Sequence, residues 1–243
     1  MIKGIHTSAN GMLPHMRKQE LIANNLANAT TPGFKREMLF TKELTKAQQK
    51  QLPSRSDWEV PMIDKTYTDF SSGGLDHTTN PLDLAIDGDG FFVLEDLDGN
   101  RFFSRSGHFT IDSEGFLAFP GGYRLAGEGG PIQVGQGTLS VGADGTVEID
   151  GLRVDRVLPQ SVNDVTLLDK VGGSLFAIPE GEALIPAFDA SVRQGYVESA
   201  NVDVVAQMVD MISTYRAYEA NARAMQDQDQ SLDHLFGRVA GRE

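Results

Sequence analysis

Hydrophobic side chains near the N-terminus recur in alternating steps of three and four residues. The series runs through Ile2, Ile5, Ala9, Met12, Met16, Gln19, Ala23 and Leu26, and Gln19 is its one polar member. This heptad spacing is typical of a helix that buries a narrow apolar stripe, as the helices of coiled coils do. Pro14 falls inside the segment and removes one helical hydrogen bond, which leaves room for a kink or for a helix that starts near Leu13.

The C-terminal segment repeats this pattern more fully. Its stripe runs through Val204, Met208, Met211, Tyr215, Tyr218, Ala222, Met225, Asp229, Leu232 and Phe236, with Ile212 beside it. Ser199 or Asn201 is the predicted cap of this helix, and Asp203 is expected in the first turn, where the helix dipole favours a negative charge.

The positions around both stripes are polar or charged, so neither helix can bury its stripe alone. The stripes must pack against each other or against neighbouring chains, and we predict ends that are frayed in the free chain and ordered in an assembly. The residues predicted to form this assembly interface are Ile5, Met12, Met16, Ala23, Leu26, Val204, Met208, Met211, Ile212, Tyr215, Tyr218, Met225 and Leu232.

Between the two helical segments, short apolar runs alternate with turn pairs. The pairs are Asp98-Gly99, Glu114-Gly115, Asp144-Gly145 and Asp150-Gly151. Three hairpins follow from them: FFVLED with RFFSRS, HFTID with FLAF, and TLSV with TVEID. Short strands at regular spacing indicate an antiparallel sandwich or barrel.

The sequence therefore predicts an α+β fold in which terminal α-helices form a coiled-coil-like domain around a central antiparallel β domain. The expected divisions are an N-terminal helix and turn at 1–34, a connector at 35–74, the β domain at 75–195 and the C-terminal helix at 196–243.

Charge is spread unevenly along the 243 residues. The first fifty residues carry eight Lys or Arg and three Glu, a net charge of +5. Because the whole chain has a net charge of −13, the remaining residues carry −18. A nucleic-acid-binding protein concentrates positive charge on its main domain, so this distribution argues against nucleic acid as a partner. The absence of cysteine excludes disulfides and thiolate metal sites.

Membrane and export signals are weak. No stretch of 18 or more apolar residues occurs, so no membrane span is expected. The first residues, MIKGIHTSANGMLPH, lack the apolar region of a cleavable signal peptide, which leaves open export by a route that does not read one.

The N-terminal helix is expected to stop in the segment Asn24-Asn25-Leu26-Ala27-Asn28-Ala29-Thr30-Thr31-Pro32-Gly33-Phe34-Lys35-Arg36. Asn28 can close the last turn, Pro32 prevents continuation and Gly33 permits a positive φ for the chain reversal. Phe34 then offers an apolar anchor. An ordinary helix end accounts for Pro32 and Gly33 but not for the cluster formed by Asn24, Asn25 and Asn28.

At these residues the sequence resembles the flagellar rod and hook family, which has an NNLAN motif followed by a TPGFK-like turn. Further blocks agree in order along the chain. They are NPLDLAI with Gly88, Gly90, Phe91 and Phe92, then SRSGHF at Ser104–Phe109, then QGYVESANV at Gln194–Val202, then MVDMI and RAYEAN in the terminal helix. The blocks span nearly the whole chain.

The resemblance implies a structural subunit of the bacterial flagellar basal-body rod. Such subunits polymerise through their terminal helices into a hollow axial structure that transmits torque. The implied partners are further copies, other rod and hook subunits and the flagellar type III export apparatus, and contact with a ring around the rod is left open. The short connector makes the chain most similar to the proximal rod subgroup.

No pattern of residues indicates an enzyme, a cofactor or a metal. The five histidines (His6, His15, His77, His108, His234) are scattered, and neither HExxH nor GxSxG occurs. The runs Asp87–Gly90 and Asp96–Asn100 hint at calcium loops but lack the full ligand alternation, so tight turns are the better interpretation. The remaining alternative is a soluble oligomeric module whose β domain recognises a ligand.

Overall fold

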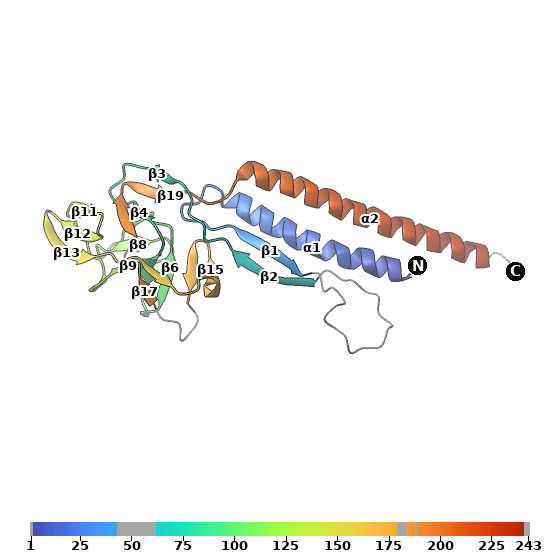
Figure 1. Ribbon diagram of the computed structural model, residues 1–243, viewed down its shortest axis with the longest axis horizontal. Coiled ribbons are helices and arrows are strands. Elements are labelled where there is room, and N and C mark those ends of the chain that lie inside the picture. The colour runs from blue at the N-terminus through green and yellow to red at the C-terminus, as the bar shows by residue number, and fades with distance from the viewer. Residues whose placement is uncertain (1, 43–61, 179–183, 188, 241–243) are drawn as a thin grey trace. The chain divides into compact units, whose positions relative to one another are not determined.

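The computed structural model describes residues 2–42, 62–178, 184–187 and 189–240, and for 2–10, 40–42, 62–65, 232–233 and 235–240 it describes the backbone but not the side chains. The described residues form two compact units. We call one the helical unit (within 1–27, 37–69 and 203–243) and the other the β unit (28–36 and within 70–202). The chain is an α+β protein with a helix near each end and an antiparallel β-rich centre, as the sequence predicts (Figure 1).

The helical unit contains two helices and one hairpin. Helices α1 (Ile2–Ala27) and α2 (Val204–Ala240) pack side by side and antiparallel, since Asn25 bonds to Gln207 while Gly11 lies against Asn221 (Figure 1). Strands β1 (Glu37–Lys42) and β2 (Met62–Thr68) pair antiparallel, and β1 also packs on α1.

Helix α1 runs from Ile2 to Ala27 and contains Pro14, so it does not start near Leu13. Packing against α2 and β1 stabilises the helix and offsets the hydrogen bond that proline removes.

The cap of α2 differs from the prediction. Asp203 is the N-cap, because its Oδ1 accepts a hydrogen bond from Ala206 N at 3.0 Å. Ser199 and Asn201 lie in the β unit and use their side chains there, so the prediction that one of them caps α2 is wrong.

The β unit is built from short strands. They are β3 (Leu75–His77), β4 (Leu84–Asp87), β5 (Phe92–Glu95), β6 (Arg101–Ser104), β7 (Thr110–Ile111), β8 (Leu117–Phe119), β9 (Tyr123–Gly127), β10 (Gly130–Pro131), β11 (Leu139–Val141), β12 (Thr146–Ile149), β13 (Leu152–Arg156), β14 (Gln160–Val162), β15 (Asp169–Gly172), β16 (Leu175–Ala177), β17 (Leu184–Pro186), β18 (Ser191–Gln194) and β19 (Tyr196–Glu198), with a 3-10 turn η2 at Val165–Leu167.

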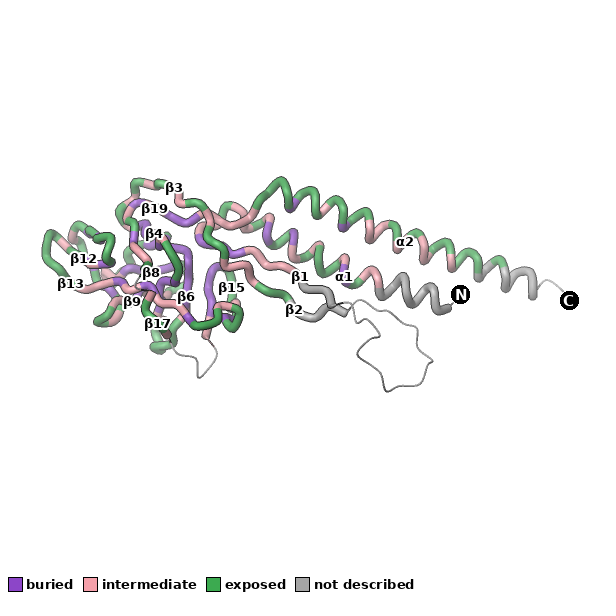
Figure 2. Tube along the Cα trace, viewed as in Figure 1, coloured by how far each residue is buried: buried purple, intermediate pink, exposed green. Residues whose placement is uncertain are grey.

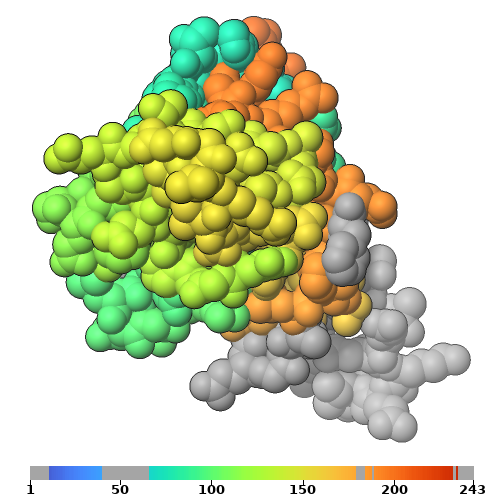
Figure 3. Space-filling model, turned by 90° about the vertical axis from the view of Figure 1, so that its left-hand side faces the viewer, coloured from blue at the N-terminus to red at the C-terminus, as the bar shows by residue number. Residues whose placement is uncertain are grey.

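All described strand pairs in this unit are antiparallel. The largest sheet has the order β15-β16-β6-β5-β9-β8-β7, with β10 beside β9, and smaller sheets are β11-β12-β13, β14-β17, β18-β4 and β19-β3. The predicted hairpins are confirmed as β5–β6, β7–β8 and β11–β12. Strands β12 and β13 form much of the surface seen in Figure 3 (yellow).

The core of the β unit lies on both faces of β5. Phe92 and Leu94 point into one apolar cluster, while Phe91 and Val93 point into another. Successive side chains of a strand alternate between faces, so a strand buried on both sides reads as the continuous apolar run FFVL. Buried residues concentrate in these strands, whereas α2 is largely exposed (Figure 2).

The boundaries between the units differ from the expected ones. Residues 28–34 were predicted to belong with the first helix, but they pack in the β unit because their hydrogen bonds run to it. The described parts of the predicted connector at 35–74 form the β1–β2 hairpin of the helical unit, and residues 43–61 lie outside the described part of the chain.

Candidate functional site

The turn that follows α1, residues 28–36, is here called the docking turn. Asn28 O accepts from Thr31 N at 3.0 Å, which closes the turn as predicted. Gly33 has a φ of +66°, which confirms the predicted positive φ. A Cβ at this position would lie 2.1 Å from Ser106 N, so glycine is required both for the backbone conformation and for the close approach.

Phe34 anchors the docking turn in the β unit. Its side chain is 1% exposed, and Lys170 Nζ lies 4.2 Å from the centre of its ring. On either side of it, Gly33 N donates to Glu198 O at 2.6 Å, and Asn201 N donates to Phe34 O at 3.4 Å. The turn therefore packs against the segment Glu198–Asn201, which lies more than 160 residues away in the sequence.

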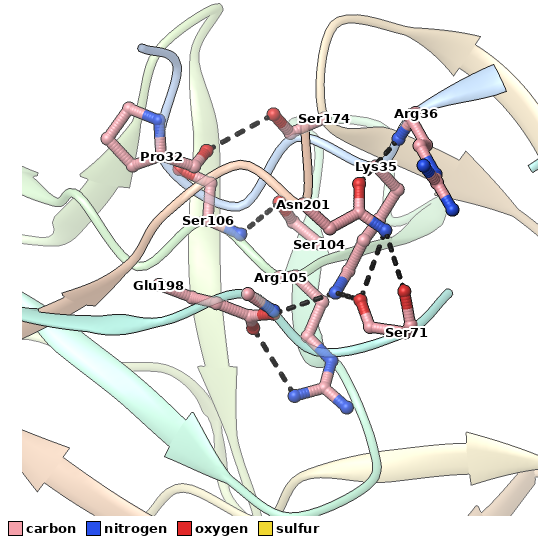
Figure 4. Close-up of polar contacts among 11 residues, drawn as sticks. Pro32, Lys35, Arg36, Ser71, Ser104, Arg105, Ser106, Ser174, Glu198 and Asn201 are labelled. Carbon is pink, nitrogen blue, oxygen red and sulfur yellow. Dashed lines mark hydrogen bonds and ion pairs between the residues drawn. The ribbon is translucent and has the colours of Figure 1, made fainter. Parts of the chain in front are cut away.

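Next to Phe34 lies a buried group of three charged side chains, here called the ion triad: Lys35, Arg105 and Glu198 (Figure 4). Lys35 Nζ lies 2.7 Å from Glu198 Oε1 and donates to Ser71 O at 2.7 Å. Arg105 Nη1 lies 3.4 Å from Glu198 Oε2, and Gly73 N also donates to Oε1 at 2.8 Å. Both oxygens of one carboxylate therefore join three separate segments of the β unit.

Arg105 is the least satisfied member of the ion triad. Its Nε is buried and has no hydrogen-bond partner within the described part of the chain, although its guanidinium lies 5.4 Å from the centre of the Phe91 ring. Burial lowers the pKa of Arg105, while the charges of Glu198 and Asp89 oppose that shift. Because two cations share one carboxylate, the triad depends strongly on Glu198.

A second site lies in the helical unit and explains part of the asparagine cluster. Asn25 Nδ2 donates to Glu37 O, and Glu37 N donates to Asn25 Oδ1, both at 2.9 Å. Asn25 Nδ2 also donates to Gln207 Oε1 at 3.4 Å. One buried amide thus joins the end of α1 to the starts of β1 and α2. Asn24 is exposed.

The predicted interface residues of α1 are mostly accessible. Met16 and Ala23 are exposed, while Met12 and Leu26 are half-buried. Ile5 lies where side chains are outside the described residues. Among the described side chains of α1, Ile22 is buried at 4% exposure, and it lies beside the predicted stripe.

The predicted residues of α2 divide in the same way. Val204, Met208, Ile212 and Tyr215 are exposed, and Met211, Tyr218 and Met225 are half-buried. The side chain of Leu232 is outside the described residues. With Val205 and Val209, the exposed residues form one side of the helix, here called the apolar face of α2: Val204, Val205, Met208, Val209, Ile212 and Tyr215.

Acidic turns of the β unit hold their own backbone. Asp96 Oδ1 accepts from Asp98 N and Asn100 N at 2.9 and 2.8 Å, and hydrogen bonding, first from the Asn100 side chain, lowers the pKa of Asp96. Among the described residues no group of three or more metal-binding side chains gathers. No described helix has the length and apolar character that crossing a membrane requires.

Sequence reasoning did not identify the ion triad, although all three residues fall in blocks that carry the family resemblance. Lys35 lies in the TPGFK turn, Arg105 in SRSGHF and Glu198 in QGYVESANV. A signal was available for Arg105 and Glu198, because each of these charges interrupts a segment of apolar or small residues. Their pairing depends on the fold, which brings together residues 93 and 163 positions apart.

Three family profiles match the chain. Residues 5–35 match a profile described as flagella basal body rod protein, residues 85–149 the D1 domain of the flagellar hook protein FlgE/F/G, and residues 193–236 the C-terminal part of flagellar basal body rod FlgEFG proteins. These stretches contain the docking turn up to Lys35, Arg105 of the ion triad, and Glu198 with the apolar face of α2.

Complete relatives show the same similarity. Flagellar basal-body rod protein FlgF of Caulobacter vibrioides is 32% identical over 228 residues, which cover 93% of each chain. FlgF of Escherichia coli is 29% identical over 98% of this chain and 97% of its own. Flagellar basal-body rod protein FlgG of Bacillus subtilis is 27% identical over 97% of this chain and 98% of its own.

Proposed function

Because this chain belongs to the flagellar basal-body rod protein family, we propose that it assembles through the apolar stripes of its two terminal helices. The chain is a structural subunit of the rod and not an enzyme, and it assembles with other rod and hook subunits. The proposal concerns which surface makes those contacts.

The apolar face of α2 is the observation that supports this surface. Its six large side chains are each between 37% and 71% exposed, and they follow one another over three turns of the helix. Burying apolar area stabilises an interface by about 25 cal/mol per Å², and contiguous apolar surface of this kind marks an interaction site. On α1, Leu13 and Met16 are exposed in the same way.

The occupant that we propose for this face is a terminal helix of a neighbouring subunit, either a copy or a related rod protein. Two helices with heptad-spaced apolar residues bury them by coiled-coil-like packing, and repetition of that contact gives a hollow axis with the β units, as sandwiches or barrels, outside. Because the contact repeats from subunit to subunit, it transmits torque.

The finer assignments follow the family resemblance. We propose export through the flagellar type III apparatus, a place in the proximal rod, and the basal-body axis as the site of residence. In this arrangement the β unit makes any contact with a ring around the rod, because the terminal helices pack against those of neighbouring subunits.

The test is a charge placed on the apolar face of α2. Ile212→Asp puts a carboxylate where the neighbour packs, and Ser213→Asp puts the same group on the adjacent exposed position outside the face. Both variants should leave the β unit folded, since neither residue belongs to it. Ile212→Asp should be missing from purified basal bodies, whereas Ser213→Asp should be incorporated.

Normal incorporation of Ile212→Asp would show that α2 makes its contacts by another surface. The mass of the free protein separates this function from the soluble binding module. A rod subunit purified alone should be monomeric at micromolar concentration, and a closed oligomer of fixed mass would favour the binding module.

A further inference from the structure

The side of α2 that packs against α1 carries polar residues between the half-buried apolar residues Met211, Tyr218 and Met225. Every seventh residue from Gln207 carries an amide or hydroxyl, in a series here called the polar ladder: Gln207, Thr214, Asn221 and Gln228. Gln207 and Thr214 are buried, the latter with 3% exposure, and Asn221 and Gln228 are half-buried. Residues seven apart lie on one side of a helix, so the polar ladder is one continuous line.

The contacts of the polar ladder are with α1. Gln207 Oε1 accepts from Asn25 Nδ2 at 3.4 Å. Asn221 Nδ2 lies 3.5 Å from where a Cβ of Gly11 would be, so the helices approach closely at a residue without a side chain. Half-buried Met211, Tyr218 and Met225 alternate with the ladder residues.

This arrangement reverses the usual one, in which a surface helix packs its apolar side inward. The apolar face of α2 lies roughly 150° around the helix from the polar ladder, at 3.6 residues per turn. The inverted packing has a cost, because Thr214 Oγ1 and Gln228 Oε1 are buried and no partner for either lies within the described part of the chain. The polar ladder is therefore a poor source of stability for the helix pair.

We propose that the polar ladder is a face-selecting element. It pairs α2 with α1 of the same chain through the hydrogen bond between Gln207 and Asn25 and the close approach of Asn221 to Gly11, and so keeps the apolar face of α2 directed outward for a terminal helix of a second subunit. This inference rests on the proposed function for the outward face, while the selection itself takes place within one chain.

A buried polar group at a heptad position acts in this way when it has a partner to lose, as Gln207 has in Asn25. If α2 turned its apolar face to α1, Asn25 and Gln207 would lose each other, and α1 would meet side chains of which only Tyr215 offers a hydrogen bond. The same turn would hide the surface that a neighbouring subunit needs. Without the ladder, hydrophobic burial alone would favour the inward turn.

The absence of cysteine from the chain allows this selection to be read by engineered disulfides. The pair Gly11→Cys with Asn221→Cys reports packing on the ladder side, because those positions are in contact. The pair Met16→Cys with Tyr215→Cys reports packing of the two apolar sides, because both residues are now exposed. Each pair is oxidised in the dilute full-length protein, and the intrachain yield is measured.

The two reporters are compared in three backgrounds. The ladder variant is Gln207→Ala, which removes the amide that accepts from Asn25 and introduces a strong helix former. The matched control is Gln226→Ala, which makes the same change at an exposed position of α2. The reporter pair Gly11→Cys with Asn221→Cys removes the Asn221 amide in all three backgrounds, so a difference in disulfide yield between them cannot come from that change.

In the parent and the control, the Gly11–Asn221 pair should form at least tenfold more intrachain disulfide than the Met16–Tyr215 pair. In the ladder variant, the Met16–Tyr215 pair should gain at least tenfold, and incorporation of the variant without cysteines into basal bodies should fall. An unchanged disulfide pattern in the ladder variant would overturn the selection, and a changed pattern with normal incorporation would overturn its role in reserving the face.

These outcomes are distinct from failure of the proposed interface. Incorporation of Ile212→Asp would refute the interface and with it the reserved role of the outward face. The disulfide yields of the free chain would still report whether the ladder selects one side of α2.

Discussion

Glu198 forms ion pairs with two buried cations in the β unit, Lys35 and Arg105. The loss of stability when Glu198 is replaced can therefore be compared with the loss when Lys35 alone is replaced. Lys35→Met removes one cation and leaves Arg105 and Glu198 as a neutral pair, with Gly73 N still bonded to the carboxylate. Glu198→Gln keeps the shape of the side chain but leaves Lys35 and Arg105 both charged and both buried while removing the carboxylate that they share.

Removing one partner of a buried ion pair costs about 3–5 kcal/mol. Lys35→Met should fall near the lower figure, because its main loss is the two bonds that Nζ makes to Glu198 and Ser71. Glu198→Gln should reach or exceed the upper figure, since two cations lose their partner at once. A domain is stable by about 5–15 kcal/mol in total, so the second variant loses a large part of that.

The free energy of unfolding of the β unit is measured by urea titration, followed by circular dichroism of its strands, with the slope compared between variants. Arg193→Met is the control, because Arg193 forms an ion pair with Asp87 at 2.5 Å in the same unit but both side chains are about half exposed. It should cost at most about 1 kcal/mol. If Glu198→Gln were no more destabilising than Lys35→Met, the assignment of Glu198 as the shared counter-ion would be refuted.

Three further outcomes are expected. Gly33→Ala should lower the melting temperature of the β unit more than Gly151→Ala, because both have positive φ but only a Cβ at Gly33 would meet backbone, so equal shifts would contradict the close approach to Ser106. The stability of the β unit should fall as the pH drops below about 4. The pKa values of four carboxylates are lowered by hydrogen bonds, first from the Asn100 side chain for Asp96, from Phe116 N for Asp112, and from the Thr146 and Thr166 side chains for Asp144 and Asp164. Each carboxylate therefore stabilises the fold above its unfolded pKa, and that contribution is lost as the pH falls through its lower folded pKa. A urea midpoint that stayed constant down to pH 3 would contradict this. Asn25→Ala should speed amide exchange of Glu37 by at least tenfold, because Glu37 N loses its acceptor, and unchanged exchange would argue against that bond.

The sequence predicted those elements that depend on local periodicity and on turn chemistry. The three- and four-residue steps located both helices, the Asp-Gly and Glu-Gly pairs located three hairpins, and Gly33 was identified by the need for a positive φ. Each of these signals is contained within a few residues, so no tertiary information was needed to read it.

The β1–β2 pairing and the ion triad could not be predicted in this way. Glu37 pairs with Thr68 and Lys35 with Glu198, and no local pattern encodes contacts at such separations. The polar ladder was missed for another reason. A search for apolar stripes finds Met208 and Ile212 and passes over Gln207 and Thr214, the residues through which the helix packs against α1. Knowing which residues are apolar does not establish which side has a partner.

The tie made by Asn201 has a mechanical consequence. The chain passes between the two units after Arg36, before Phe70 and after Val202, and near all three points it is joined by one side chain. Asn201 Oδ1 accepts from Arg36 N at 2.8 Å, and its Nδ2 lies 3.2 Å from both Ser71 O and Ser71 Oγ (Figure 4). Tension applied to the chain at any one of these three points is therefore shared among the three through Asn201 before it reaches a strand of the β unit.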